Sequence, residues 1–233
     1  MTSIELDREL IAGKRLLCAV SGGADSMCLL HQLWLEGFDV TAAHFEHGIR
    51  GEESRCDAAF VEGFCREHGI PFVTDRADVP AYAAAHGMGL EEAGRALRYD
   101  FLERAADVLG CEKIVTAHTL DDLAETLLFN LARGSGPSGL RGIPRARGRI
   151  VRPMLNVSRA EVEAYLTEHR VPHVEDSTNR SDDYARNLIR HHAVPALKRI
   201  NPRFAEAAAR AAALSARDED YFRAEAERFL AAH

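Results

Sequence analysis

The sequence contains no apolar run of 18 or more residues, and none of its five cysteines forms a CxxC pair. The first absence argues against a membrane-spanning helix, and residues 1–7 lack the charged and apolar regions of a signal peptide. We therefore expect a cytoplasmic protein without a membrane partner. Widely spaced cysteines in odd number indicate free thiols and argue against a zinc or iron–sulfur site. Cys18, Cys28 and Cys111 lie in or beside apolar segments and are expected to be buried.

Positive charges are fewer than negative charges, since the chain of 233 residues has 29 Lys and Arg against 36 Asp and Glu and a net charge of −7. The charge is uneven, however. Residues 135–203 hold thirteen Lys and Arg against seven Asp and Glu, a net +6, and the rest of the chain carries −13. This basic segment predicts either a contact surface for a phosphate backbone or arginines that pair with nearby carboxylates. The hydrophobic content of 46% is enough for one substantial core and an appendage.

Short apolar runs alternate with helical patterns in the first half of the chain, which predicts a doubly wound parallel α/β sheet. The expected strands cover Arg15–Val20, Phe38–Phe45, Pro71–Thr74 and Lys113–Ala117, and the expected helices cover Ala24–Trp34, Ser54–His68, Val79–His86, Leu90–Leu109 and Asp121–Leu131. Ligands of such sheets bind outside the carboxyl ends of the strands. Residues 21–26, His44 and His118 fall at these ends and are expected to lie at one ligand site.

The pattern changes after Leu131, where small and flexible residues appear. A basic loop-like stretch, a helix with a capping box, a polar turn-rich stretch and an alanine-rich helix are then expected, at Arg141–Arg152, Arg159–Glu168, 176–183 and Ala205–Ala232. These changes predict an α/β domain over 1–134, the remainder of the catalytic core with the basic segment over 135–203, and a C-terminal helical appendage over 204–233.

The six residues from Ser21 to Ser26, here called the Ser21 loop, read Ser-Gly-Gly-Ala-Asp-Ser between a strand and a helix. Their N–H groups can surround an anion at a helix N-terminus, and Gly22 and Gly23 can take positive φ and allow phosphate to approach. Asp25 repels phosphate unless a divalent cation lies between them, so the loop predicts a metal-bound pyrophosphate group. No lysine of a Walker-type loop is present. The plainer alternative is a turn in which Ser26 or Asp25 caps the helix.

A second motif, Ala-His-Thr-Leu-Asp-Asp-Leu-Ala-Glu-Thr, places carboxylates at another strand-to-helix junction. Asp122 and Glu125 share a helix face, from which they could approach one Mg²⁺ directly or through water. The alternative is an ordinary helix N-terminus, with Asp121 as its cap and the other two carboxylates favouring the helix dipole. If the motif faces the first loop, Mg²⁺ bridges Asp25 and Asp122 to the phosphates.

Two further groups carry positive charge or imidazoles. Arg95 and Arg98 share a helix face and could hold a phosphate or a carboxylate, although Glu91 offers Arg95 an ordinary surface ion pair. His44 ends an expected strand, and Arg50 follows it. Such residues near a phosphate loop indicate either a ligand contact or structural histidines. The sequence has no third ligand at the spacing of a zinc site, which argues against zinc.

These motifs carry a family resemblance. The first loop resembles the SGGxDS signature of the PP-loop ATP pyrophosphatases, which cleave ATP between the α and β phosphates. The chain resembles the tRNA(Ile)-lysidine synthetase family from about Arg15 to Phe204 through the strings SGGADS, HGIRG, EEAGRALRY, AHTLDDLAET, LARGSGPSGLRGI, RPMLNVSRAEVEAYL, VEDSTN and ARNLIRHHAVPAL. The resemblance implies an adenine nucleotide alpha hydrolase-like fold. It also implies ATP-dependent ligation of free L-lysine to C2 of the wobble cytidine of tRNA(Ile), through an adenylated intermediate and with Mg²⁺.

The resemblance further implies roles for individual residues. The residues that match the nucleotide site are Ser21, Gly22, Gly23, Ala24, Asp25, Ser26, His44, His118, Asn187 and Arg190. The implied catalytic group comprises Asp25, Asp122, Glu125, Arg95 and Arg98, of which Asp25 and Asp122 bind Mg²⁺. The basic segment would contact the anticodon arm of the tRNA.

Three positions depart from the family pattern, since Thr119 replaces a usual His, Leu123 a usual Gln and Glu46 a usual Asn. The first two changes remove hydrogen-bonding groups that could orient the carboxylates. Many relatives also continue beyond the position of His233 into domains that grip the tRNA acceptor stem, so this chain is not expected to reach their full tRNA affinity.

Two other functions stay open. A PP-loop thiolase or amidotransferase would act on another tRNA or on a small metabolite, although the missing CxxC pair argues against the iron–sulfur thiolases. A nucleotide-binding regulatory module would keep the loop without catalysis, which Thr119 and Leu123 favour. The sequence leaves the oligomeric state open, and a homodimer is among the states that it allows.

Overall fold

The computed structural model describes residues 3–48, 52–175 and 185–232, so Arg50 and the stretch 176–183 lie outside the described residues. The chain forms two compact units. Unit 1 comprises residues 1–117 and 146–175, and unit 2 comprises residues 118–145 and 176–233. The units are discontinuous in sequence, and they cut across the linear division at residues 134 and 203 that the composition suggests. Among the described residues, no helix combines the length and the apolar character needed to cross a membrane.

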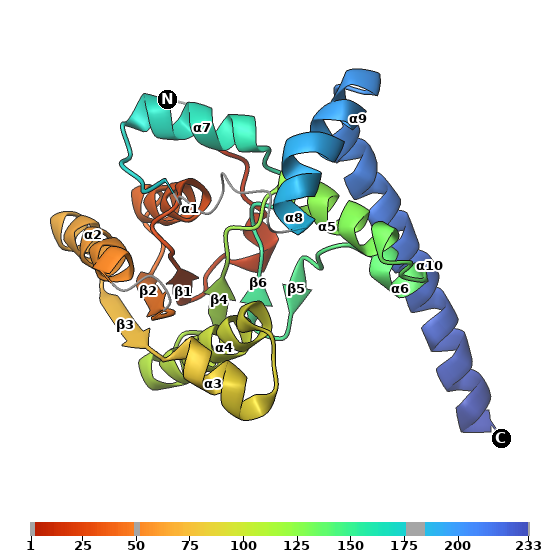
Figure 1. Ribbon diagram of the computed structural model, residues 1–233, viewed down its shortest axis with the longest axis horizontal. Coiled ribbons are helices and arrows are strands. Elements are labelled where there is room, and N and C mark those ends of the chain that lie inside the picture. The colour runs from red at the N-terminus through yellow and green to blue at the C-terminus, as the bar shows by residue number, and fades with distance from the viewer. Residues whose placement is uncertain (1–2, 49–51, 176–184, 233) are drawn as a thin grey trace. The chain divides into compact units, whose positions relative to one another are not determined.

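Unit 1 is built on a six-stranded sheet in the order β3-β2-β1-β4-β6-β5 (Figure 1). Neighbouring strands are parallel except β5 and β6, which form an antiparallel hairpin. The strands are β1 (Leu16–Ala19), β2 (Val40–Glu46), β3 (Phe72–Arg76), β4 (Lys113–Val115), β5 (Ala146–Arg147) and β6 (Ile150–Val151). The four expected strands are confirmed. The expectation of a loop over Arg141–Arg152 is wrong, because strands of two residues are too short to show an alternating pattern.

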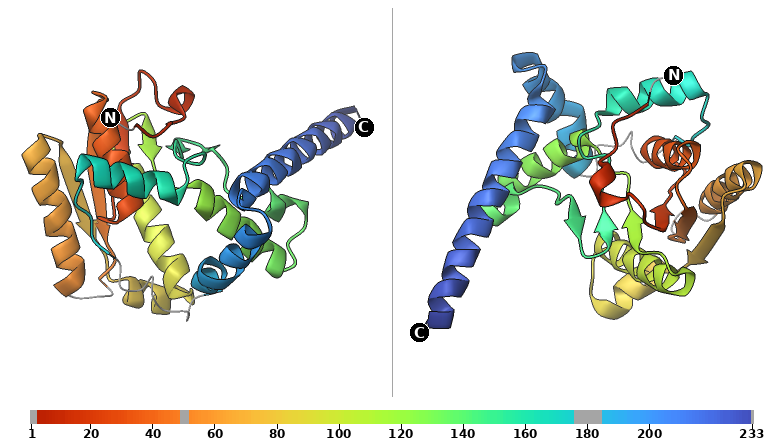
Figure 2. Two further views of the ribbon diagram at one scale, coloured as in Figure 1. Left: turned by 90° about the horizontal axis from the view of Figure 1, so that it is seen from above. Right: turned by 180° about the vertical axis from the view of Figure 1, so that it is seen from behind.

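The helices agree with the sequence pattern within a few residues. Those of unit 1 are η1 (Arg8–Leu10), α1 (Ala24–Leu35), α2 (Glu52–His68), α3 (Val79–His86), α4 (Leu90–Leu109) and α7 (Arg159–His169). Those of unit 2 are α5 (Leu120–Ala132), α6 (Pro137–Leu140), α8 (Ala185–Leu188), the π-helical turn η3 (Ile189–Ala193), α9 (Val194–Ile200) and α10 (Phe204–Ala232). Two further views show α10 as one long helix (Figure 2).

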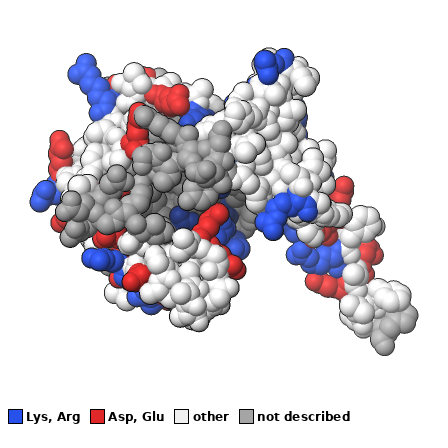
Figure 3. Space-filling view, viewed as in Figure 1, with Lys and Arg blue, Asp and Glu red and all other residues white. Residues whose placement is uncertain are grey.

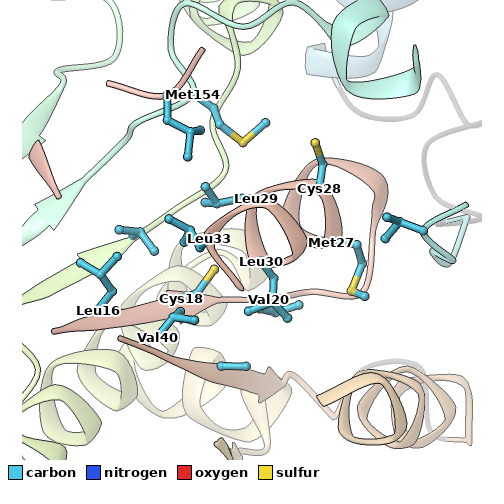
Figure 4. Packing of buried hydrophobic residues seen from close by; sticks show 14 of the residues in the cluster. Leu16, Cys18, Val20, Met27, Cys28, Leu29, Leu30, Leu33, Val40 and Met154 are labelled. Atoms are coloured by element: carbon cyan, nitrogen blue, oxygen red, sulfur yellow. The ribbon is translucent and has the colours of Figure 1, made fainter. Parts of the chain in front are cut away.

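The core of unit 1 lies on both faces of its sheet, because successive side chains of a strand point to opposite faces. Leu16 and Cys18 of β1 belong to a cluster with α1, α2 and α7, whereas Leu17 belongs to a second cluster with α4. Figure 4 shows the first cluster, in which Leu30 of α1 points towards Cys18 and Val20 at β1, and Leu29 points to the side of Met154. Helices on both faces confirm the doubly wound fold. Burial of three free thiols is also confirmed, at Cys18, Cys28 and Cys111.

The order of the strands places the Ser21 loop at the topological switch point of the sheet. The chain runs from β1 to β2 and β3 on one side, and then crosses to β4 on the other side of β1. Ligands of open α/β sheets bind at the carboxyl ends of strands where the order reverses in this way. The Ser21 loop follows β1 directly at that position.

Unit 2 is held together by the packing of α10 against α5. Leu120 and Ala124 of α5 form a buried cluster with Ala205 and Ala208 of α10. Alanine side chains let the two helix backbones approach closely, and this contact explains the alanine-rich sequence of α10. The same packing fixes the orientation of the first turns of α5, which carry the acidic motif.

Candidate functional site

The Ser21 loop is ordered by its own hydroxyl groups. The backbone N–H of Ser21 donates to Ser26 Oγ at 3.2 Å, and Ser26 Oγ donates to the Gly23 carbonyl oxygen at 2.9 Å. The N–H of Gly23 donates to Ser21 Oγ at 3.3 Å. The two serine hydroxyls therefore stabilise the loop itself, and their expected role as donors to an anion stays a prediction. The expectation that Ser26 or Asp25 caps α1 is wrong, because Gly23 is the N-cap and no side chain caps this helix.

The two glycines of the loop differ in conformation. Gly22 has φ +91°, and its carbonyl oxygen accepts a hydrogen bond of 2.9 Å from the N–H of Val174. Gly23 has φ −74° and ψ 164°, which any residue can adopt, so positive φ at Gly23 is not found. The N–H groups of the first turn of a helix have no intrahelical acceptors. At α1 they belong to Ala24, Asp25 and Ser26, and they are suited to bind an anion.

Arg159 is a charged neighbour of Asp25 among the described residues of unit 1, and the motifs alone do not indicate it. Arg159 Nη1, at the start of α7, lies 4.0 Å from Asp25 Oδ2. The Asp25 side chain is 27% exposed. A partly exposed carboxylate beside an anion-binding turn fits a Mg²⁺ ion that arrives with phosphates, because Mg²⁺ in proteins usually takes one or two carboxylates, waters and phosphate oxygens.

His44 holds the strand that precedes the loop. Its side chain is 4% exposed, and its Nδ1 donates to the Val20 carbonyl oxygen at 2.9 Å. Burial lowers the pKa of His44 below its usual value, although the hydrogen bond to Val20 opposes this effect. A neutral imidazole at this place positions the backbone of the loop. His118 is half-buried at the start of unit 2.

Arg95 and Arg98 come together around Tyr99 in unit 1. Their Cζ atoms lie 5.4 and 5.3 Å from the centre of the Tyr99 ring. The Cζ atom of Arg147, on β5, lies 5.2 Å from the same centre. The alternative partner Glu91 forms no salt bridge with Arg95 in the described structure. The phosphate or carboxylate that the sequence predicts for this arginine pair therefore stays a valid expectation.

The acidic motif of unit 2 begins with a capping box. Thr119 is the N-cap of α5, so the alternative of Asp121 as the cap is wrong. The N–H and Oγ1 of Thr119 donate to Asp122 Oδ2 at 2.9 and 3.1 Å, and the N–H of Asp122 donates back to Thr119 Oγ1 at 3.4 Å. Thr119 therefore orients Asp122, contrary to the expectation that it removes orienting groups. Leu123, the other departure, is a buried core residue.

The remaining oxygens of the acidic motif bind arginines from α8 and η3. Arg190 holds Glu125 through two hydrogen bonds, from Nε to Oε1 at 2.7 Å and from Nη2 to Oε2 at 2.8 Å. Arg186 donates to Glu125 Oε2 at 3.2 Å and to Asp122 Oδ1 at 2.9 Å. Because the Glu125 side chain is only 4% exposed, its charge requires such partners. Asn187, between the two arginines, is also buried.

This network changes the interpretation of the acidic motif. Both oxygens of Asp122 and both of Glu125 accept hydrogen bonds within unit 2, so arginines already offset part of the negative charge that a metal ion would meet there. Arg186 is the residue that sequence reasoning missed. Its spacing of four residues from Arg190 could have indicated a shared helix face. A π-helical turn such as η3 is rare and is frequently found at functional sites.

The structure brings the predicted residues together in three groups. The Ser21 loop with His44 and the arginines around Tyr99 belong to unit 1, and Asp122, Glu125 and Arg190 belong to unit 2. A Mg²⁺ ion held jointly by Asp25 and Asp122 stays a prediction. In the described part of the chain, no cluster of three or more His, Cys, Asp or Glu side chains could hold a metal ion.

Arginines of the basic segment pair largely with carboxylates outside it. Arg141 contacts Asp220 at 3.0 Å, and Arg149 contacts Asp107 at 2.6 Å. Figure 3 shows Lys and Arg interspersed with Asp and Glu among the coloured side chains of the viewed face. The contact of this segment with a phosphate backbone stays a prediction, and ion pairs such as those of Arg141 and Arg149 leave fewer of its arginines available for that contact.

Known proteins with similar sequences share these elements. Residues 4–197 match the PP-loop domain family. The chain is 46% identical over 194 residues to the tRNA(Ile)-lysidine synthase of Thermotoga maritima, covering 82% of this chain and 47% of that protein. It is 44% identical over 197 residues to the tRNA(Ile)-lysidine synthase of Porphyromonas gingivalis, covering 84% and 43%. The chain thus spans about half the length of these curated relatives.

A solved structure supports the fold. The U34-tRNA thiolase NcsA of Methanococcus maripaludis, determined with its 4Fe–4S cluster, superposes with a TM-score of 0.71 at 18% identity, covering 89% of this chain and 74% of that one. At this identity the likeness concerns the fold alone. Because the family match covers most of the chain and includes both the Ser21 loop and the acidic motif, the protein belongs to the PP-loop domain family and is similar within it to the tRNA(Ile)-lysidine synthases.

Proposed function

We propose that this protein ligates lysine to C2 of the wobble cytidine of tRNA(Ile) at the expense of ATP, giving lysidine. The observation that carries the proposal is the 46% identity to a tRNA(Ile)-lysidine synthase over a segment that holds the complete Ser21 loop and the acidic motif. The reaction requires RNA and ATP in the same compartment, which agrees with the expected cytoplasmic location.

In the first step, the C2 carbonyl oxygen of the cytidine attacks the α-phosphorus of ATP, and the bond from this phosphorus to the bridging oxygen of the β-phosphate breaks. The pyrophosphate that leaves is bound by the N–H groups at the start of α1, from Ala24 to Ser26. These donors are fixed before the reaction, because Ser21 and Ser26 order the loop and His44 holds the preceding strand. Such preorganised donors stabilise charge that develops in the transition state.

Mg²⁺ supplies charge neutralisation for the phosphates when it is bound. Asp25 is the residue that would hold it in unit 1, since its partly exposed carboxylate adjoins the anion-binding turn. A role of Asp122 as a second ligand stays a prediction, and Arg186 competes for it because Arg186 already donates to Asp122 Oδ1. Arg95 and Arg98 would contact the nucleotide or the RNA.

In the second step, the side-chain amine of lysine attacks C2, the bond from C2 to the AMP oxygen breaks, and the amine gives up a proton. The amine must be neutral to attack, so a nearby carboxylate orients it or accepts the proton. Glu125 is held by two arginines and is better suited to position Arg190 than to accept a proton. Contacts of Asn187, Arg190 and His118 with the nucleotide stay predictions.

The test is release of pyrophosphate by the full chain with ATP, Mg²⁺, lysine and a tRNA(Ile) transcript, followed by mass spectrometry of the RNA. We expect lysine-dependent release and a product heavier by lysine minus water. Asp25→Asn should abolish release without changing the circular dichroism spectrum, whereas Asp39→Asn, an exposed acidic residue of the same unit, should not change it. Unchanged turnover of Asp25→Asn would remove the assigned role of Asp25.

The same assay separates the alternatives. Release that depends on a sulfur donor would support a thiolase, and binding of ATP without turnover would support a regulatory module. The named relatives at 41–47% identity favour the lysine-dependent reaction, since the eight compared are all tRNA(Ile)-lysidine synthases.

A further inference from the structure

Four arginines gather around one tyrosine in unit 1. Arg95 and Arg98 of α4 and Arg147 of β5 place their Cζ atoms between 5.2 and 5.4 Å from the centre of the Tyr99 ring. Arg152, which follows β6, is 3% exposed and acts electrostatically on the Tyr99 phenol. We call these five residues the Tyr99 cluster. They come from two segments about fifty positions apart, the helix α4 and the β5–β6 hairpin.

Three arginines of the Tyr99 cluster differ from a neighbouring arginine in their partners. Among the described residues, Arg95, Arg98 and Arg147 have no carboxylate within salt-bridge distance. Arg104, on the same helix, contacts Asp100 at 2.9 Å and Asp75 at 3.1 Å. In the described part of the chain, Arg95, Arg98 and Arg147 therefore lack the acidic partners that Arg104 has.

Arg149, two residues beyond Arg147 on the same hairpin, also has acidic partners that Arg147 lacks. It contacts Asp107 at 2.6 Å and Glu103 at 3.5 Å, whereas Arg147 contacts the Tyr99 ring. Two arginines of one hairpin thus have opposite environments, one with acidic partners and one with an aromatic partner. The difference gives a matched pair of positions for an experiment.

Like charges at such separation repel, and burial adds to the cost of Arg98 and Arg152. Burial lowers the pKa of both guanidinium groups, although Tyr99 opposes the effect. Burial raises the pKa of the Tyr99 phenol, but the charges of Arg98, Arg95 and Arg152 outweigh it, and the net shift is downward. The face of an aromatic ring attracts cations and holds the guanidinium groups in place. It does not neutralise them, so the arrangement is suited to a negatively charged ligand.

We propose that the Tyr99 cluster binds a phosphate group, with Arg147 as a ligand-binding residue beside Arg95 and Arg98, and with Tyr99 as the residue that positions the guanidinium groups. Planar guanidinium groups bind phosphate oxygens through paired hydrogen bonds. This proposal rests on the proposed function, because that function brings two phosphate sources to the protein. One is the backbone of the RNA substrate, and the other is ATP.

The experiment measures binding of the full chain to two probes, an RNA stem-loop with the anticodon sequence of tRNA(Ile) and ATP with Mg²⁺. The variant is Arg147→Gln, and the control is Arg149→Gln, which removes the same charge from the same hairpin. Arg147→Gln should weaken binding of one probe by about tenfold at low salt. If that probe is the RNA, the slope of log Kd against log salt should fall by about 0.7, the value for one phosphate of a single strand.

Tyr99 is tested by two replacements that differ in the ring. Tyr99→Phe keeps the aromatic face and should retain binding within about twofold, whereas Tyr99→Leu removes the face and should weaken the same probe as Arg147→Gln. Urea unfolding of each variant shows whether the fold is kept. A purely structural role of the ring would lower stability without changing the salt slope.

Weaker RNA binding alone identifies the backbone as the phosphate source, and weaker ATP binding alone identifies the nucleotide. The proposal is overturned if Arg147→Gln and Arg149→Gln bind both probes equally well, or if the wild-type chain binds neither. Lysidine formation is scored separately. If no lysidine forms and Arg147→Gln still weakens binding, then the proposed function fails and the phosphate site stands.

Discussion

Gly22 and Gly23 are adjacent in the Ser21 loop, yet the backbone requires glycine at only one of them. Gly22 has φ +91°, where a side chain is strained, and a Cβ atom there would also contact Val61, Phe60 and Val174 at 3.5 to 3.7 Å. At Gly23 a Cβ atom would meet only Ser21 Oγ, at an ordinary 3.5 Å. The protein therefore has no folding reason for glycine at position 23, and a ligand that approaches the backbone closely supplies one.

Replacement of Gly23 tests this argument. Gly23→Ala should change the free energy of unfolding by less than about 0.5 kcal/mol, because its φ of −74° suits alanine. It should weaken ATP binding by about tenfold or more, because the methyl group would occupy space that a phosphate needs. Calorimetry with ATP and Mg²⁺ and urea unfolding measure the two effects.

The matched variant is Gly22→Ala. It should lower the free energy of unfolding by about 1–2 kcal/mol through strain at positive φ. If Gly23→Ala binds ATP as tightly as the wild type, the phosphates do not approach the backbone at this loop.

His31 forms part of a buried aromatic cluster that lies apart from the Ser21 loop residues. Its Nδ1 lies 2.7 Å from the Tyr165 hydroxyl, and its ring is 5.4 Å from that of His169 and 6.2 Å from that of His68. Burial, with smaller contributions from His169 and His68, lowers the pKa of His31 from 6.5 to about 4. The folded protein therefore holds His31 neutral.

The sign of the resulting pH dependence follows from proton binding. Below pH 6.5 His31 binds a proton in the unfolded chain but not in the folded chain. The contribution of His31 to the free energy of unfolding is therefore fully present above pH 6.5 and is lost as the pH falls towards 4. The contribution of His31 is about 3 kcal/mol across this window. Urea unfolding as a function of pH should show a shallower loss in His31→Gln than in the wild type. His86→Gln, at an exposed position of α3, should keep the wild-type slope. Equal slopes in all three proteins would contradict the assignment.

At the scale of elements, the start of α5 depends on a helix that is distant in sequence. The capping box of Thr119 and Asp122 is local and could be predicted from spacing, because it needs only residues three apart. The pairing of Glu125 with Arg186 and Arg190 joins residues more than sixty positions apart. Sequence periodicity placed Asp122 and Glu125 on one face, but nothing in it indicates which side chains arrive to neutralise that face.

Removal of Arg190 should destabilise unit 2 strongly. Arg190→Met leaves the buried Glu125 carboxylate with Arg186 alone, and the expected loss in free energy of unfolding is about 3 kcal/mol. The double variant with Glu125→Gln should lose less than the sum of the two single variants, because it removes the uncompensated charge. Urea unfolding provides the values.

Arg223→Met is the control for that measurement. Arg223 is exposed and lies 3.8 Å from Glu219 four residues away, so its removal should cost less than about 0.5 kcal/mol. A loss for Arg190→Met no larger than that of the control would show that Glu125 does not depend on this pair.

The fold was more predictable than the site, because elements depend on patterns of neighbouring residues and the site depends on contacts between distant ones. Strands such as β1 and helices such as α4 repeat a pattern over several residues, whereas the two-residue strands β5 and β6 have no pattern to repeat. The Ser21 loop was recognisable because its chemistry is contained in six consecutive residues. Arg147 and Arg152 were not, because their relation to Tyr99 exists only after the hairpin packs near α4.

At the scale of the whole molecule, charge that is separated along the chain is largely recombined by folding. The segment 135–203 carries +6 in sequence, but Arg141, Arg149 and Lys198 pair with carboxylates that lie outside it. Net charge by segment therefore overstates the positive surface available to RNA. The positions that remain without an acidic partner, such as Arg147, are better candidates for phosphate contacts than the segment as a whole.

The second half of α10 provides a prediction about the extent of the folded chain. The buried residues of this helix, Ala205, Ala208 and Ala212, lie in its first half, and Glu219 and Asp220 make its last contacts with α6 and Arg141. Phe229 and Leu230 are 63% and 74% exposed. Deletion of residues 224–233 should therefore change the free energy of unfolding by less than about 0.5 kcal/mol and leave pyrophosphate release unchanged.

A longer deletion is the matched comparison. Removing residues 214–233 takes away Glu219 and Asp220, so Ser138 and Arg141 lose their partners, and about 1–2 kcal/mol of stability should be lost. Urea unfolding of the two truncated proteins beside the full chain gives both values. If the shorter deletion is as destabilising as the longer one, the exposed end of α10 contributes to the stability of unit 2. In that case the packing of its first half against α5 is insufficient to hold the helix in place.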